Sequence, residues 1–325
     1  MIRAGHPQCK NNGTEREATL STWLSRGSAC LALAIAACAG NALYAFGELG
    51  GSLQHWSSAI VAGALIIYMV VHGRGSYSAK LLLTFAVTVF LVGWSFETLS
   101  ILTGFPFGNY HYTAVMAPFL GHVPVSVMPA YCVMGYVSWS MARILIGRFD
   151  GETDAVLRWR APVVAAALMV VWDLSMDPLR ATVEQRWVWL DGGNHLGVPL
   201  ENYAGWALVT WVMFQSFALA LPRDIEPARP VLRGEFPAYW LSVPLAYASF
   251  AFEYVLNPAV AGGAETTVLA NSTELPIATI FREVAVLTAS TMLPLALAAA
   301  TIVYRRCLTA GGDRDAAVVT VDEDR

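Results

Sequence analysis

Residues 93–113 read GWSFETLSILTGFPFGNYHYT, where an apolar helical stretch with one carboxylate runs into a loop rich in glycine and aromatic residues. The carboxylate is Glu97, and the first glycine of the loop is Gly104. At about 1.5 Å of rise per residue, Glu97 lies roughly 10 Å inside the end of the predicted helix. A carboxylate that deep in lipid is costly unless it faces a bundle interior or a wet cavity, so Glu97 is a candidate functional residue. The alternative is that it only joins helices by hydrogen bonds.

The composition of the whole chain indicates a polytopic membrane protein. Of the 325 residues, 56% are hydrophobic and only 14% are charged, and the mean hydropathy is +0.51. A soluble globule of this size needs more polar groups. The fold class predicted is an all-α membrane bundle of about eight transmembrane helices, each near the ~17–25 residues that a span needs. The predicted spans are 28–49, 53–72, 79–103, 123–146, 161–177, 203–221, 237–256 and 277–304.

The distribution of Lys and Arg predicts the orientation of these spans. Basic residues gather in both terminal segments and in alternate connections, whereas the remaining connections hold only Arg180 and Arg186. Because this bias sets topology, both termini are predicted to be cytoplasmic in a multi-pass protein of the cell membrane. Residues 1–27 are predicted to be a disordered cytoplasmic tail, 28–304 the transmembrane domain and 305–325 a second cytoplasmic tail.

Several function classes lack support in the sequence. The five cysteines form no CxxC pair, which argues against a disulfide framework or a structural zinc site. The net charge of −4 with scattered basic residues gives no nucleic-acid stripe, so no nucleic acid is expected as a partner. The six histidines show none of the short spacings that a membrane di-iron site needs. No nicotinamide, flavin or P-loop fingerprint occurs, and no cofactor is expected.

A second acidic motif, DLSMDPL, occupies residues 173–179. Asp173 and Asp177 are four residues apart and so lie on one helix face, with Pro178 expected to end the helix. Such a pair can share a proton or hold a divalent cation. The alternative that both acids only cap a helix end is disfavoured, because an acid at a helix C-terminus opposes the dipole. Membrane prenyltransferases use a similar DxxxD pair for magnesium diphosphate, but no second aspartate-rich motif accompanies this one.

Further charged residues fall at the same predicted side of the bilayer. Glu253 and Asn257 are four residues apart near the end of the seventh span, and Arg282 lies inside the last span. A buried arginine needs a partner, and the sequence offers Glu97, Asp173, Asp177 or Glu253. One polar cluster over an apolar cavity is therefore predicted.

An acid and a carboxylate in one apolar pocket suit the addition of water to an alkene. A carboxylic acid can protonate the double bond, while a carboxylate beside an arginine can orient or deprotonate water. Protonation of a terminal trisubstituted double bond gives a tertiary cation. Aromatic faces stabilise a desolvated cation by about 2 kcal/mol or more per ring.

Several sequence segments together resemble those of a known family. The motifs at 93–113 and 173–179, with HVPVSVMP at 122–129, WVWLDGG at 187–193 and GVPLENYAGW at 197–206, resemble the carotenoid biosynthesis membrane proteins. The resemblance covers roughly 40–304. It implies a multi-pass enzyme without a redox cofactor, acting on a long polyene of the lycopene or bacterioruberin-precursor type. Characterised members hydrate the terminal double bond of acyclic carotenoid ends.

On this basis the residues receive predicted roles. Asp173 or Asp177 is the proton donor, Glu97 the water-orienting base and Arg282 the charge partner, and the roles of Glu97 and the aspartates are exchangeable. The predicted substrate contacts are Trp94, Phe107, Tyr110, His111, Tyr112, Trp189, Asn202 and Glu253, with no metal. Expected partners are a long-chain carotenoid, the lipid bilayer and other membrane enzymes of the pathway. The alternatives are a prenyltransferase-like enzyme that uses the DxxxD pair, and a non-catalytic carotenoid carrier or assembly protein.

Overall fold

Long helices with local start and stop signals make up most of the protein. The structure, a computed structural model, describes residues 12–48, 50–149, 153–222, 236–260, 267–270 and 273–322. Ser78 begins α3 (Ala79–Thr103) by accepting a hydrogen bond from the Leu81 N–H at 3.3 Å. Gly104 ends this helix in the left-handed region, with φ +79°, and its N–H donates to the Ser100 carbonyl at 2.7 Å. The predicted end of the third span is therefore confirmed.

The other helices follow the predicted order. They are α1 (Asn12–Ala45), α2 (Ser52–Ser76), α4 (Val127–Leu145), α5 (Ala155–Asp177), α6 (Leu200–Ala220), α7 (Phe236–Val260), α8 (Ile277–Ser290) and α9 (Met292–Asp322). Since only Thr291 separates α8 from α9, this pair corresponds to the last predicted span. The prediction of a polytopic helical membrane bundle is confirmed.

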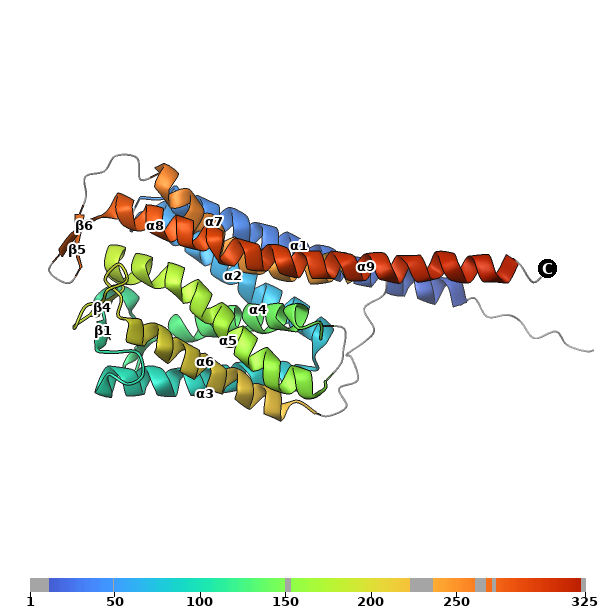
Figure 1. Ribbon diagram of the computed structural model, residues 1–325, viewed down its shortest axis with the longest axis horizontal. Coiled ribbons are helices and arrows are strands. Elements are labelled where there is room, and N and C mark those ends of the chain that lie inside the picture. Colours follow the sequence, from blue (N-terminus) through green and yellow to red (C-terminus); the bar gives the residue numbers. More distant parts are fainter. Residues whose placement is uncertain are drawn as a thin grey trace, which may run out of the picture.

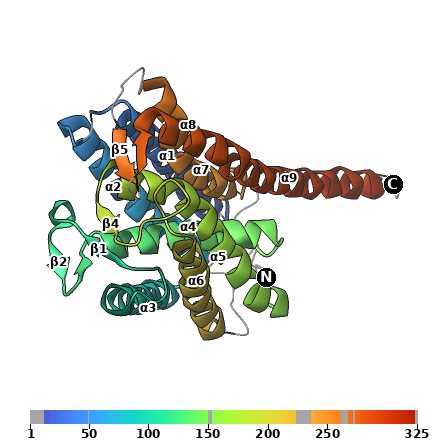
Figure 2. The ribbon, with the colours of Figure 1, turned by 60° about the vertical axis from the view of Figure 1, so that its left-hand side comes forward.

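Six segments of the described chain are long and apolar enough to cross a membrane: Arg26–Ala45, Ser52–Ser76, Ala79–Thr103, Ala155–Val183, Leu200–Ala220 and Ile277–Thr309. The predicted spans in α4 and α7 are not among them. In α4 the cause is its central position, where it packs against α2, α3, α5, α7 and α9 (Figures 1 and 2). Every side chain from Val133 to Ile144 is buried, so polar residues such as Ser138 and Arg143 meet protein and not lipid.

Two helix ends differ from the predicted tails. The helix α1 begins at Asn12 and α9 ends at Asp322, so both enter segments that the sequence analysis expects to be disordered. Residues 12–27 of α1 and residues 305–322 of α9 contain no proline that would stop the helix. Figure 1 shows the start of α1 and the end of α9 at the same end of the bundle, as an even number of crossings requires.

The α-helix of the fifth span ends at Asp177, directly before Pro178, as predicted, but the helical segment does not end there. The chain continues from α5 into the π-helix η2 (Pro178–Val183). A proline lacks an N–H and its ring crowds the carbonyl four residues earlier, and the wider π turn relieves both conflicts. Residues up to Val183 therefore extend the helix beyond the two aspartates.

Short strands close the end of the bundle away from the termini (Figure 1). Strand β1 (Tyr110–Tyr112) pairs antiparallel with β4 (Trp187–Trp189), so that Tyr110 faces Trp189 and Tyr112 faces Trp187. Two further pairs are β2 (Phe119–Leu120) with β3 (Val123–Pro124), and β5 (Thr267–Ala270) with β6 (Thr273–Pro276). The β1–β4 pair joins the two aromatic loops that the charge distribution places on one side.

Gly205 of α6 lets the loop after α3 approach the helix closely. A Cβ atom at this position would lie 2.7 Å from Phe107 Cδ1 and 2.7 Å from the Pro106 carbonyl oxygen. Gly205→Ala is therefore expected to displace the loop and to lower the free energy of unfolding by about 1–3 kcal/mol, measured by thermal unfolding in detergent.

The matched control is Gly63→Ala in α2, where an added Cβ meets no atom within 4 Å. This variant is expected to be neutral or to gain up to about 1 kcal/mol, because alanine is the better helix former. Equal melting temperatures for the two variants would contradict the proposed close contact at Gly205.

Candidate active site

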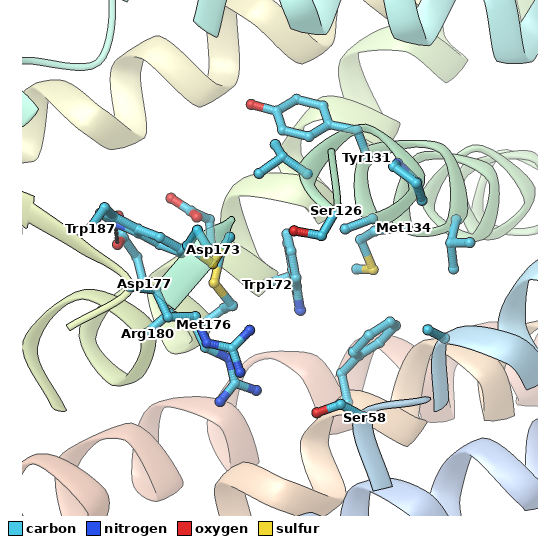
Figure 3. Close-up of a pocket in the computed structure, with 18 of the residues that line it drawn as sticks. Ser58, Ser126, Tyr131, Met134, Trp172, Asp173, Met176, Asp177, Arg180 and Trp187 are labelled. Atoms are coloured by element: carbon cyan, nitrogen blue, oxygen red, sulfur yellow. Dashed lines mark hydrogen bonds between the residues drawn. The ribbon is translucent and has the colours of Figure 1, made fainter. Parts of the chain in front are cut away.

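A cavity of about 360 Å³ lies behind the β1–β4 pair and is lined by residues from each of the helices α1 to α7 (Figure 3). Most of the residues predicted to form the site line it. These are Glu97, Phe107, Tyr110, Tyr112, Asp173, Asp177, Trp189, Asn202 and Glu253. The structure therefore brings together three acids from α3 and α5 that are up to 80 residues apart in the chain.

Three tyrosine hydroxyl groups surround the buried Glu97. Tyr112 donates to Oε2 at 2.9 Å, Tyr131 donates to Oε1 at 2.7 Å, and Tyr110 donates to Oε2 as well. Tyr110 and Tyr112 reach the same carboxylate because alternate residues of a strand point to the same face. Each O–H donor offsets part of the cost of burying the charge of Glu97.

The tyrosines of β1 keep their protons. Burial of the two hydroxyl groups raises the pKa of Tyr110 and the pKa of Tyr112 well above the ordinary value, and the charge of nearby Glu97 acts in the same direction. Both groups are therefore hydrogen-bond donors to Glu97 throughout the physiological pH range.

His111 does not line the cavity. It lies between the two tyrosines on β1 and is exposed on the opposite face of the strand. The position of His111 therefore does not support the predicted substrate contact. Tyr131 was missed by the sequence analysis because it lies on α4, 34 residues from Glu97, and depends on the packing of α3 against α4.

The two aspartates of α5 share one amide donor. Asn202 Nδ2 donates to Asp173 Oδ2 at 2.9 Å and to Asp177 Oδ2 at 2.6 Å. Trp187 Nε1 donates to Asp177 Oδ1 at 2.7 Å, so both oxygens of Asp177 are hydrogen-bonded. Asp173 is 0% exposed, and its Oδ1 has no hydrogen-bond partner among the residues that the structure describes. An unsatisfied buried oxygen is costly, which makes Asp173 Oδ1 the atom best placed to carry or accept a proton or to meet a ligand.

The donor set does not resemble a cation site. Within the described part of the chain, no three His, Cys, Asp or Glu side chains are grouped so as to hold a metal ion. The Asn202 amide group directs hydrogen atoms between the two carboxyl groups, where a bridging cation would need oxygen ligands.

Arg180 lines the cavity, and Arg282 does not. Arg282 is exposed on α8 and does not line the cavity, so its position does not support the predicted role. Arg180 lies in η2, and its Nη2 pairs with Glu253 Oε2 at 2.6 Å. The spacing of 173, 177, 180 and 184 follows one helix face and is the signal that identifies Arg180 once the helix continues past Pro178.

Arg180 is part of a balanced ionic network. It also pairs with Glu184, which pairs in turn with Arg186 Nε at 2.6 Å and accepts a hydrogen bond from the Tyr44 hydroxyl at 2.8 Å. Burial raises the pKa of Glu184, but the two arginines outweigh it and hold the pKa below the ordinary value. Two arginines thus face two glutamates, and the network joins α1, η2 and α7.

Aromatic rings form the walls between the acids. Tyr131 stacks on Trp206 with ring centroids 4.8 Å apart, and Trp172 meets Trp206 edge-on at 6.0 Å. Trp94 lies elsewhere, since its Nε1 donates to the Leu120 carbonyl at 3.2 Å and its ring lines a second cavity of about 430 Å³ between α3 and α4. The position of Trp94 therefore does not support the predicted contact, whereas Trp172, Trp206 and Tyr131 line the cavity that holds the acids.

Comparison with known proteins gives two matches. Residues 56–270 match the protein family described as carotenoid biosynthesis protein, and this range contains all cavity residues except Asn41 and Tyr44. The chain is also similar to the bisanhydrobacterioruberin hydratase of Haloarcula japonica, with 28% identity over 123 residues. That match covers 38% of this chain and 40% of the hydratase, so the chain matches about two fifths of the length of that relative. No solved structure matches the chain.

Proposed function

Because the chain belongs to the carotenoid biosynthesis protein family, we propose that it is a carotenoid hydratase of the cell membrane. It adds water to the terminal double bond of an acyclic carotenoid end and produces a tertiary alcohol. The observation that carries this proposal is the contrast between two buried carboxyl groups in one aromatic cavity. Glu97 accepts three O–H donors, whereas Asp173 has an oxygen without a partner among the described residues. The similarity to a protein named as a hydratase supports the same reaction class.

Asp173 is the proton donor in this mechanism. The Oδ1–H proton goes to the less substituted carbon of the terminal double bond, whose π electrons form the new C–H bond. The other alkene carbon becomes a tertiary cation. The Asn202 amide, which already donates to Asp173 Oδ2, stabilises the carboxylate that remains after the proton has left.

Glu97 orients and deprotonates the attacking water. The water oxygen supplies the electron pair for the new C–O bond, and its proton goes to Glu97. The proton then returns from Glu97 to Asp173 through water, so the net reaction is the addition of one water molecule. The faces of Tyr131, Trp206 and Trp172 stabilise the cation, by about 2 kcal/mol or more per ring in a desolvated site.

Among the residues that the structure describes, the ionic network leaves the reacting acids without a basic partner. Arg180 and Arg186 are both paired with Glu184 or Glu253. Asp173 and Glu97 instead meet neutral donors from Asn202 and the tyrosines. An arginine next to Asp173 would favour the ionised carboxylate. Because both arginines are paired with glutamates instead, Asp173 can serve as the proton donor.

Isotope labelling in cells that make lycopene tests the reaction. With ¹⁸O-labelled water, the alcohol formed by the wild-type protein is expected to carry the label, because the hydroxyl oxygen comes from water. With ¹⁸O-labelled molecular oxygen, the product is expected to be unlabelled by mass spectrometry. Label from molecular oxygen would overturn the mechanism. A folded, membrane-inserted protein that yields no alcohol would favour a carotenoid carrier or assembly protein.

A further inference from the structure

The active-site cavity is open sideways between α2 and α4. Five of the residues that line it are partly or fully accessible at its rim, and we call them the lateral portal: Ala62 and Ile66 of α2, and Ser126, Pro129 and Ala130 at the start of α4. Ile66 is 41% exposed. Its neighbour Leu65, which lines the same cavity, is 1% exposed. The lining therefore passes from surface to interior within one turn of α2.

A continuous apolar path leads from this rim to the acids. Beyond Leu65 and Met134, which are both buried, the lining continues to Trp172 and Tyr131 and then to Asp173. Figure 3 shows Ser58 of α2 on one side of the open space and Tyr131 and Met134 of α4 on the other, with Asp173 and Asp177 at the far wall. The path thus connects the outer surface of two helices with the reacting groups.

The end of the bundle next to the acids is covered. The β1–β4 pair lies over the cavity, and the Asn109 side-chain amide donates to Asp191 Oδ2 at 2.6 Å beside it. Thr113 extends the cover, because its N–H donates to the Arg186 carbonyl at 3.0 Å. A rod-like apolar molecule therefore meets hydrogen-bonded backbone at this end but an apolar opening at the side.

The volume of the cavity limits how much of a long molecule can enter it. Its volume of about 360 Å³ is near the lower limit of the roughly 300–1,000 Å³ typical of small-molecule sites. A long carotenoid is comparable in length to the hydrocarbon core of a bilayer, about 30 Å, so only one end of it fits. Pro129 also lines the second, apolar cavity, and apolar surface thus continues outside the portal along α4.

We propose that one end of an acyclic polyene enters the active site directly from the bilayer through the lateral portal, while the rest of the molecule stays among the lipid chains. This inference rests on the proposed function for the identity of the occupant. Because α2 is long and apolar enough to span the membrane, the portal is expected to face acyl chains, so that the substrate does not pass through water. Only end groups that are narrow enough to pass the portal then reach Asp173.

A matched pair of tryptophan substitutions in α2 tests the portal. Ala62 lines the cavity, whereas Ala59, one turn earlier, is also exposed but does not line it. In nanodiscs that contain lycopene, Ala62→Trp is expected to lower the initial rate of alcohol formation at least tenfold, and Ala59→Trp is expected to leave it unchanged. Ala130→Trp, on the opposite side of the opening, is expected to act like Ala62→Trp. Thermal unfolding of each variant shows whether it is folded.

A binding measurement separates the portal from the reaction. In the Asp173→Asn background, the lycopene retained by purified protein is measured with and without each tryptophan substitution. Loss of lycopene with Ala62→Trp but not with Ala59→Trp supports the portal even if no variant forms alcohol, in which case only the hydratase proposal fails. Full lycopene retention and full activity in folded Ala62→Trp and Ala130→Trp proteins would overturn the portal and leave the hydratase proposal standing.

Discussion

Asp173→Asn is expected to lower the rate of alcohol formation from lycopene by about 10²–10⁴-fold, the usual contribution of a general acid. The amide preserves the size of the side chain but has no acidic proton to give to the double bond. The measurement is the amount of alcohol formed per folded protein in nanodiscs, by chromatography. The variant is expected to remain inserted in the membrane, because it removes no ion pair.

Asp177→Asn is the matched control for this variant. Both oxygens of Asp177 accept hydrogen bonds, from Asn202 and Trp187, so this residue is the weaker candidate for the donor. A smaller loss is expected in Asp177→Asn than in Asp173→Asn. The reverse order would move the donor role to Asp177, and near-normal activity in Asp173→Asn would remove Asp173 from the mechanism.

Glu97→Gln is expected to cause a loss of similar size, about 10²–10⁴-fold in kcat, because an amide cannot take the proton of the attacking water. The amide nitrogen is itself a donor and faces tyrosine hydroxyls that now donate to a carboxylate. At least one hydroxyl must therefore rotate or lose its partner, and a lower melting temperature is expected as well.

The Tyr131→Phe variant distinguishes the role of the Glu97 carboxylate from the role of the hydroxyl group that donates to it. This variant removes one of the three O–H donors and keeps the ring that stacks on Trp206. Measurable activity is expected, since Tyr110 and Tyr112 still hold the carboxylate. If Tyr131→Phe were as inactive as Glu97→Gln, the water-orienting role would belong to the hydroxyl group and not to Glu97.

The sequence predicts the bundle well because long apolar segments are readable from hydropathy alone. It singles out the acids as candidates for the same reason, since Glu97 and Asp173 stand out in apolar runs. Arg180 could not be assigned, because Pro178 is a strong stop signal in a sequence and only the π turn overrides it. The helix face that Arg180 shares with Asp177 exists only after that turn has formed.

The contacts around Glu97 mark a second limit of sequence reasoning. The strand period that separates Tyr110 and Tyr112 from His111 is readable only once residues 110–112 are known to form a strand. That strand exists through its pairing with Trp187–Trp189, far along the chain. Tyr131 and Trp206 likewise meet through the packing of separate helices, which no local pattern encodes.

The pairing of β1 with β4 also sets the order in which the site is assembled during synthesis. In the chain, 77 residues separate Tyr112 from Trp189. At about 5–20 residues per second, the ribosome completes the covering strand roughly 4–15 s after β1. Glu97 is thus synthesised before the cavity around it has formed. Of its three tyrosine donors, Tyr131 belongs to α4 and does not depend on this pairing, so it is the donor that can satisfy the acid during that interval.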